Sequence, residues 1–373
     1  MNLLKVILKQ ETPMIHFESN LPNATIRGTE LKPKIDNFIV SELKMIEPDL
    51  YENFKEVINE KDFGNGKKAP YKINISGSTE TIYIQPGTPY FGNMGGNDMK
   101  AVVGKSDITL NLFSFNRKVL ELIKEVIPYV FAYNNFGTRQ NKGFGCFTPV
   151  FNTFNGIHSE YEYNLEEILM KKSPVFVKKF KSRTNRPFNS LKVIDENYKI
   201  LKSGKGGKNF SGYKKSELMS YLYDKNIRWE KVKIKSEIYK NDRNLFNKLK
   251  VTNPSENKKS LDVDFEKARF TRALLGLAEF NEYSLNHGKP CKVNIKDLQG
   301  EIERFPSPLV FKVRGNQIYV FSNEIDDRMF NRKFNFEVNR KVSFELMTPT
   351  KNEFNLQDFL KVGLLNLEFK EVN

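Results

Sequence analysis

The chain is organised around one stretch, Phe136-Gly-Thr-Arg-Gln-Asn-Lys-Gly-Phe-Gly-Cys-Phe147. Three glycines and two cations fall within it: Gly137, Gly143, Gly145, Arg139 and Lys142. The glycines allow positive φ and the close approach of another backbone. Such a loop suits a phosphate chain, because bare N–H groups and fixed charges can face it together. A tight helix-to-strand turn with solvated basic residues explains the pattern equally well.

Length and composition indicate a globular protein of about two domains. The 373 residues are 39% hydrophobic and 13% aromatic, with a formal net charge of +15 and a pI near 9.4. This basic balance favours a polyanionic partner or an anionic surface. The codon bias of an A/T-rich genome produces the same excess of lysine, so the positions of the few arginines are more informative than the total.

The sequence also indicates where the protein resides. Its two cysteines, Cys146 and Cys291, lie far apart and form no CxxC pair, which favours a reducing cytoplasm. Lys5 and Lys9 interrupt the first apolar run, so this run is typical of a strand and not of a signal peptide. No segment approaches the roughly 18 uninterrupted apolar residues of a membrane span. We expect a soluble cytoplasmic protein with no membrane partner.

A second basic motif surrounds the start of a predicted helix within residues 24–36. Pro33 suits the first helical position, and apolar residues continue at helical spacing to Ile46. Three cations lie near this helix start: Arg27, Lys32 and Lys34. Free N–H groups at a helix N-terminus favour anions, so these cations would complete a phosphate site. For Lys32 and Lys34, ordinary surface lysines near a turn are the alternative.

The order of predicted elements in the N-terminal part favours an α+β sandwich with helices on one face of an antiparallel sheet. Strands are expected at residues 3–17, 71–77, 81–85, 107–114 and 147–154. A further helix is expected at residues 117–133. The strands at 71–77 and 81–85 would pair through a short turn, and residues 86–104 would form a long exposed loop.

The middle and the C-terminal part are less regular. Residues 171–188 interleave basic residues, including Arg183 and Arg186, with phenylalanines. This pattern is typical of single-stranded nucleic acid binding and equally of an edge strand with a solvated lysine face. Residues 266–283 are expected to form one long helix. The expected boundaries are an N-terminal domain at 1–160, a basic insertion or connecting region at 161–260 and a C-terminal part at 261–373.

The sequence offers no positive case for an enzyme. Three histidines, His16, His158 and His287, form no HxxxH or HxH pair, so a zinc site is not expected. No acidic cluster has metal-ligand spacing, and neither a GxSxG elbow nor a GxGxxG helix start is present. We therefore expect no catalytic residue, no metal and no cofactor. His16 lies in an apolar strand and is expected to be structural.

Two motifs together resemble those of the RAMP superfamily of CRISPR-associated proteins. Residues 135–147 are similar to its glycine-rich G-x-R-x-x-x-G-F-G loop, and residues 24–34 are similar to the basic helix start after its first strand. Residues 302–312 also resemble a strand pair of the two-domain member of type III-B (Cmr) effector complexes. The strong match is confined to the first two stretches, whereas the order of elements extends the resemblance along the chain.

The resemblance implies tandem ferredoxin-like (RRM-like) domains with antiparallel sheets and a glycine-rich loop. It also implies a subunit that binds CRISPR RNA beside other effector subunits in antiviral defence. The residues implied in RNA contact are Arg27, Lys32, Lys34, Gly137, Arg139, Lys142, Gly143 and Gly145. Backbone subunits of the family carry a catalytic Asp after strand 1. Residues 21–26 contain none, so target cleavage by this chain is not expected.

Three functions follow from these observations. The first is a non-catalytic RNA-binding subunit of a type III CRISPR interference complex. The second is a metal-independent endoribonuclease that matures CRISPR RNA, which needs a histidine near the first helix, and His16 is the candidate in range. The third is a protein–protein scaffold whose basic charge reflects codon bias.

Overall fold

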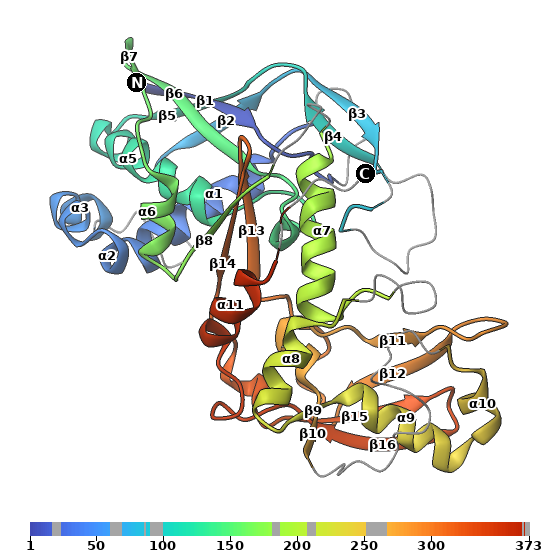
Figure 1. Cartoon of the computed structure of the whole chain (residues 1–373). Helices are drawn as coiled ribbons and strands as arrows, with labels where there is room; N and C mark the ends of the chain where they lie inside the picture. The colour runs from blue at the N-terminus through green and yellow to red at the C-terminus, as the bar shows by residue number, and fades with distance from the viewer. Residues whose placement is uncertain are drawn as a thin grey trace. The chain divides into compact units, whose positions relative to one another are not determined.

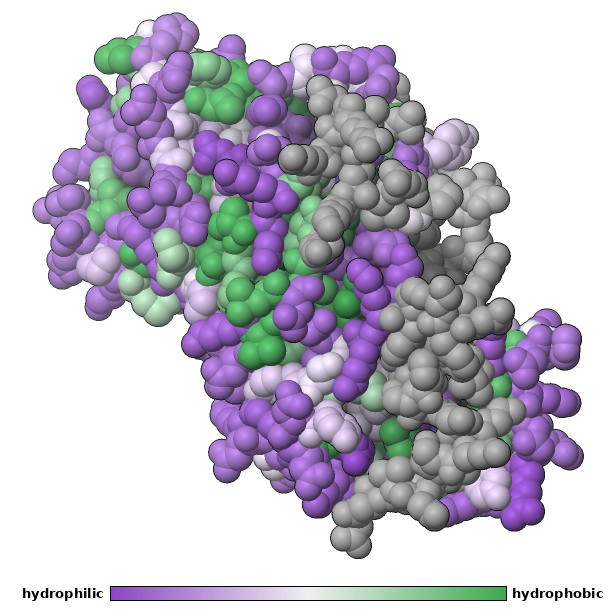
Figure 2. All heavy atoms as spheres, viewed as in Figure 1, coloured by the Kyte–Doolittle hydropathy of each residue, from purple (hydrophilic) through white to green (hydrophobic). Residues whose placement is uncertain are grey.

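The computed structural model describes residues 1–16, 24–59, 69–85, 87–89, 100–180, 187–206, 214–250, 267–367 and 369. The chain forms two compact units. The first comprises Met1–Asp195, Val310–Ser322 and Phe369–Asn373, and the second comprises Glu196–Leu309 and Asn323–Glu368. Both units mix helices with antiparallel sheets (Figure 1). On the face drawn in Figure 2, hydrophilic residues are widespread and apolar residues form scattered patches, in keeping with the charged composition.

A five-stranded antiparallel sheet organises the first unit, in the order β2-β5-β1-β6-β7. Its strands are β1 (Asn2–Gln10), β2 (Lys72–Ser76), β5 (Ile108–Ser114), β6 (Phe147–Phe154) and β7 (Ile157–Glu160). Every second residue of β5 is buried, and β1 alternates in the same way from Leu4 to Leu8. The sheet therefore has one face in the core and one face outside it. The strands expected at 71–77, 107–114 and 147–154 are confirmed, whereas the one expected at 3–17 ends at Gln10 and β7 was not expected.

Helices α1 (Gly28–Asn37) and α5 (Arg117–Tyr133) contact the core face of this sheet (Figure 1). The shorter helices pack against α5, against a π-helical turn at Phe38–Glu42 or against one another. They are α2 (Leu43–Ile46), α3 (Pro48–Asn53), α4 (Lys55–Asn59) and α6 (Leu165–Met170). The predicted helix at 117–133 is confirmed, and the Asn116 side chain caps its start. Pro33 lies inside α1 and not at its start. Burial of Leu31 and Ile35 on either side of Pro33 holds the helix despite the missing N–H.

Two expectations for the first unit are wrong. The strands β2 and β3 (Thr79–Tyr83) do not pair with each other, because β2 pairs with β5 and β3 pairs with β4 (Lys100–Gly104). The last residues of the expected loop form β4. Ala101 and Val102 of this strand are buried, and the burial of their apolar side chains favours a paired strand over an exposed loop. Residues 86 and 90–99 of that loop lie outside the described residues.

A three-stranded sheet of order β13-β14-β8 brings a distant segment into the first unit. Its strands are β8 (Phe176–Lys179), β13 (Leu309–Arg314) and β14 (Gln317–Ser322). Val310, Tyr319 and Phe321 from this hairpin join the core of the first unit. Because β8 lies at the edge of the sheet, the edge-strand interpretation of the basic segment is confirmed for its residues 176–179.

The second unit contains a four-stranded antiparallel sheet of order β11-β12-β15-β16. Its strands are β11 (Phe280–Tyr283), β12 (Cys291–Asp297), β15 (Lys333–Val338) and β16 (Val342–Met347). The helices are α8 (Glu217–Asp224), α9 (Glu230–Asn241), α10 (Arg243–Lys248) and α11 (Leu356–Leu365), while α7 (Asn189–Lys202) begins in the first unit. Two short strands, β9 (Arg228–Trp229) and β10 (Ala268–Arg269), pair in parallel.

The long helix expected at 266–283 is wrong. Residues 268–269 form β10, Thr271–Leu275 form a 3-10 turn, and Phe280–Tyr283 form β11. Gly276 has a φ of 113°, which no helix contains, and it separates the 3-10 turn from β11. None of the helices in the described part of the chain is long and apolar enough to cross a membrane.

Candidate functional site

The glycine-rich loop joins α5 to β6 and has left-handed backbone at four positions. The φ angles are 80° at Gly137, 60° at Arg139, 83° at Gly143 and 67° at Gly145. Arg139 precedes a 3-10 turn at Gln140–Lys142, and Gly143 follows it. The positive φ predicted for the three glycines is confirmed.

The glycines also permit very close packing. A Cβ atom on Gly145 would lie 1.9 Å from the carbonyl oxygen of Phe136, and one on Gly137 would lie 2.4 Å from that of Ile15. At Gly143 it would lie 2.7 Å from Cδ1 of Ile194 in α7. Real Cβ atoms do not come this close to a backbone oxygen, so no other residue fits at the first two positions without movement of the loop.

The N–H groups of the three glycines have acceptors within the protein. Gly137 donates to the Glu30 carboxylate at 3.1 and 3.3 Å, and Gly143 donates to the Gln140 carbonyl at 3.2 Å. Gly145 donates to the carbonyl of Pro13 at 2.9 Å. The bare N–H groups expected to face a phosphate are therefore engaged, and the glycines shape the loop instead of presenting donors.

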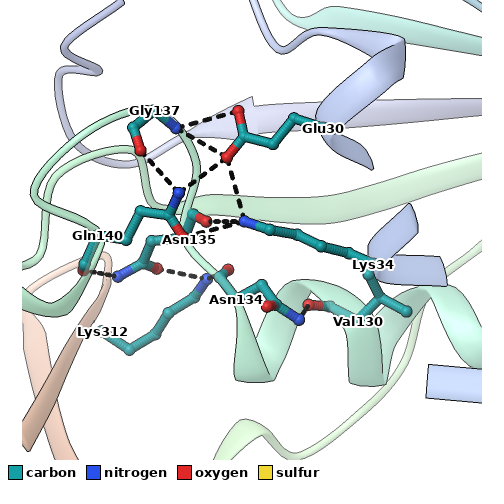
Figure 3. A network of polar contacts seen from close by, with 8 residues as sticks. All are labelled: Glu30, Lys34, Val130, Asn134, Asn135, Gly137, Gln140 and Lys312. Carbon is teal, nitrogen blue, oxygen red and sulfur yellow. Dashed lines mark hydrogen bonds and ion pairs between the residues drawn. The ribbon is translucent and has the colours of Figure 1, made fainter. Parts of the chain in front are cut away.

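Helix α1 clamps the loop through Glu30 and Lys34 (Figure 3). The Lys34 ammonium donates to Oε1 of Glu30 at 3.1 Å, to the carbonyl of Asn135 at 2.7 Å and to Oε1 of Gln140 at 3.0 Å. Burial lowers the pKa of Lys34, an effect that the nearby Glu30 carboxylate opposes. A lysine ammonium has three donors. All three are used here, so the direct phosphate contact predicted for Lys34 is not supported.

Lys312 of β13 approaches the same loop from the distant hairpin (Figure 3). It is buried, and its ammonium donates to the carbonyls of Phe131 and Asn134 and, at 3.0 Å, to Oδ1 of Asn135. These acceptors lie at the C-terminus of α5, where unpaired carbonyls and the helix dipole favour a cation. Burial lowers the pKa of Lys312 to about 8.

Asn135 connects Lys312 to the loop. Its amide Nδ2 donates to the carbonyl of Gln140 at 2.7 Å and to that of Phe311 at 3.0 Å, while its Oδ1 accepts from Lys312. Sequence reasoning did not single out Lys312 or Asn135. The available signal was a lysine inside the apolar run of residues 309–313, where an unpaired charge would be costly.

The cations of the first motif also have protein partners. Nε of Arg27 donates to Nε2 of His16 at 3.0 Å. The Lys32 ammonium donates to the carbonyls of Ala69 and Tyr71 and lies 3.3 Å from the centre of the Tyr71 ring. Burial lowers the pKa of Lys32. Lys32 is thus part of a packed network, and the interpretation as an ordinary surface lysine is wrong.

The structure brings several predicted site residues to one loop. Thr138 of the loop donates to the carbonyl of Ile15, next to His16, so the His16–Arg27 pair adjoins the loop. Arg139 and Lys142 are half-buried on the loop itself, and Nε of Arg139 and Nζ of Lys142 are buried atoms. Arg183 and Arg186 lie outside the described residues. Within the described ranges, no three histidine, cysteine or acidic side chains are grouped as metal ligands.

Three solved structures are similar to this chain at low sequence identity. The crystal structure of apo Cmr1 from Pyrococcus furiosus is 12% identical over 87% of this chain and 90% of that one, with a TM-score of 0.37. A chain of type III-B Cmr-beta bound to cognate target RNA and AMPPnP is 12% identical over 98% of both chains, with a TM-score of 0.39. A Cmr-beta chain bound to cognate target RNA is 14% identical, with a TM-score of 0.29, and the match covers 41% of this chain and only 60% of that one.

Two family models account for most of the sequence. The model of the Cmr1 N-terminal domain matches residues 1–205, and that of the Cmr1 C-terminal domain matches residues 213–372. No curated protein matches the chain. The assignment rests on the two domain models, which follow one another in order and leave few residues unmatched. The chain therefore belongs to the Cmr1 family.

Proposed function

We propose that this chain is a non-catalytic CRISPR RNA-binding subunit of a cytoplasmic type III-B interference complex, acting beside other effector subunits in antiviral defence. The observation that carries the proposal is the loop at 136–147, a turn that carries Arg139 and Lys142 and is hydrogen-bonded to α1. A preformed set of cations can bind a phosphate chain without a further loss of side-chain freedom. Such contacts hold the RNA backbone and carry no base information.

The hydrogen bonds rank the candidate RNA contacts. Arg139 and Lys142 come first because they lie on the loop and are part of the turn that α1 and Lys312 hold in place. Lys34 holds the loop in place and makes no direct phosphate contact, since its three donors are used. Arg27 and Lys32 contribute charge beside the loop and at the start of α1. Arg183 and Arg186 stay candidate RNA contacts on the sequence pattern alone.

We assign a ferredoxin-like fold to the first unit. The element order β1-α1-β2-β5-α5-β6, with strand order β2-β5-β1-β6, is that of a βαββαβ unit. In the second unit, the four strands follow one another across the sheet as they do along the chain, with β13 and β14 between β12 and β15, which is not the order of a βαββαβ unit. The proposal of a ferredoxin-like fold is therefore restricted to the first unit.

The contacts of His16 favour RNA binding over RNA cleavage. Its ring is buried, and its Nε2 accepts a hydrogen bond from Arg27. A general base must reach the proton that it abstracts, and here the ring is buried and one of its two nitrogens already accepts from Arg27. His16 supports Arg27 in this arrangement and takes no part in chemistry.

Incubation of the purified protein with CRISPR repeat RNA tests this proposal. We expect salt-sensitive binding without cleavage, in wild type and in His16→Ala alike. Cleavage that His16→Ala abolishes, in a protein that still folds, would establish the endoribonuclease instead. If neither binding nor cleavage occurred, and the protein still assembled with other subunits, the chain would be a scaffold.

A further inference from the structure

The face of the five-stranded sheet that lies away from its helices carries ordered rows of side chains. The strand register places Leu3 of β1 opposite Phe113 of β5. Ile7 of β1 lies opposite Thr109 of β5 on one side and Phe151 of β6 on the other. These positions alternate with the buried residues of the same strands, so they all point to the same, outer face.

Large apolar side chains on this face are exposed. Phe151 is 48% exposed and Leu3 is 38% exposed, while Ile7 and Phe113 are half-buried. The outer face of an antiparallel sheet usually carries polar residues. A cluster of apolar side chains on such a face marks an interaction site more often than single exposed residues do.

The charges on the same face are positive. Lys5 lies between Leu3 and Ile7 on β1, and Lys72 of β2 lies opposite Phe113. Both lysines are exposed, and none of the outward-facing residues of β2, β5, β1 and β6 is acidic. Two carboxylates lie at the margins of this face: Glu160 on the edge strand β7, opposite Phe151, and Glu11 after the end of β1, beside Lys9.

We propose that this outer face binds single-stranded RNA by stacking bases on Phe151 and Phe113 and pairing phosphates with Lys5 and Lys72. Aromatic side chains stack on every base, and flanking cations follow the backbone, which together form a platform for single strands. The core of a protein–protein interface is depleted of lysine, so the two lysines favour RNA over a protein partner.

This inference rests on the proposed function and adds a second RNA contact region. The strand β6 begins at Phe147, where the glycine-rich loop ends. Phe151 lies four residues further along β6, roughly 13 Å away at about 3.3 Å per residue. The loop and Phe151 are therefore connected through the start of β6, and a single RNA strand that contacts both regions is part of the proposal.

The test compares RNA affinities of Phe151→Ala and a control, Ile157→Ala, for single-stranded RNA and for an abasic backbone of equal length. Ile157 is 74% exposed and lies opposite Phe154, so it points to the face of the β6–β7 pair that is opposite to the face of Phe151. We expect Phe151→Ala to weaken binding of the RNA roughly 5- to 150-fold, the loss of one stacked base. The abasic backbone should bind Phe151→Ala and wild type alike, and Ile157→Ala should behave as wild type.

Each other outcome overturns the inference in a distinguishable way. Equal RNA affinity of Phe151→Ala and wild type, with weaker binding by Arg139→Ala/Lys142→Ala, would limit RNA contact to the loop. Equal RNA affinity combined with weaker assembly of Phe151→Ala with other subunits would make the face a protein docking surface. RNA binding by neither wild type nor variants would refute the proposed function as well. Circular dichroism of each variant establishes that its fold is retained.

Discussion

Replacement of Lys312 tests how the loop is held in place. Lys312→Met keeps the length of the side chain and removes its ammonium. Three acceptors then lose their donor at the buried end of α5: the carbonyls of Phe131 and Asn134, and Oδ1 of Asn135. Asn135 also fixes Gln140 in the loop, so we expect both the stability of the unit and the order of the loop to fall.

The size of the effect follows from two opposing contributions. Three hydrogen bonds from a charged donor contribute about 1.5–3 kcal/mol each. Burial opposes them, because it lowers the pKa of Lys312 from 10.5 to about 8, and that shift corresponds to about 3 kcal/mol. The difference predicts that Lys312→Met lowers the free energy of unfolding by about 1.5–6 kcal/mol at pH 7.

The pH dependence of this loss has a definite sign. Below pH 8, Lys312 is protonated in both the folded and the unfolded chain. Between pH 8 and 10.5 the folded chain releases the proton while the unfolded chain keeps it. Stability rises with pH where the unfolded state binds more protons. The deficit of Lys312→Met relative to wild type should therefore grow by up to about 1.4 kcal/mol per pH unit in this window.

Urea unfolding at pH 7 and pH 9.5 measures both quantities. Lys118→Met is the control, because its side chain is 64% exposed and should change stability by less than about 0.5 kcal/mol. A Lys312→Met variant as stable as wild type, or a deficit that shrinks between the two pH values, would show that the ammonium is not buried as described.

Two further substitutions examine the loop. Gly145→Ala should lower the free energy of unfolding by about 1–3 kcal/mol more than the control Gly156→Ala. Both glycines have positive φ, but the added methyl group meets the Phe136 carbonyl only at Gly145. Equal losses of stability in urea unfolding would argue against the close contact. Lys34→Met should lower stability while leaving the salt dependence of RNA affinity unchanged, because its donors are engaged; a flatter salt slope would reveal a direct phosphate contact.

Local sequence patterns predicted much of the first unit. The helix at 117–133 and the strands at 108–114 and 147–154 follow from the pattern of apolar residues, because the apolar side chains of each segment are mostly the ones that it buries. The loop conformation follows from glycine spacing, because only glycine takes positive φ and close contact at Gly137 and Gly145 without strain.

Such local patterns could not predict contacts between segments that lie far apart in the chain. Nothing local indicates that residues 310–322 join the first unit or that Lys312 reaches α5, some 180 positions earlier in the chain. The apolar stripe of 266–283 fits a helix, but Gly276 interrupts the segment, and β10 and β11 on either side of it pair with β9 and β12. The occupied N–H groups of the glycines likewise depend on Glu30 and Pro13, which only the fold brings near.

The salt dependence of RNA affinity tests the central claim most directly. Wild type and Arg139→Ala/Lys142→Ala are titrated with single-stranded RNAs of several sequences over a range of salt concentrations. Each cation that neutralises a phosphate contributes roughly 0.7 to the log–log slope, so the double variant should show a slope flatter by about 1 to 1.5. The change should be similar for every RNA sequence, because phosphate contacts carry no base information. An unchanged slope in a folded double variant would mean that the loop is only a turn.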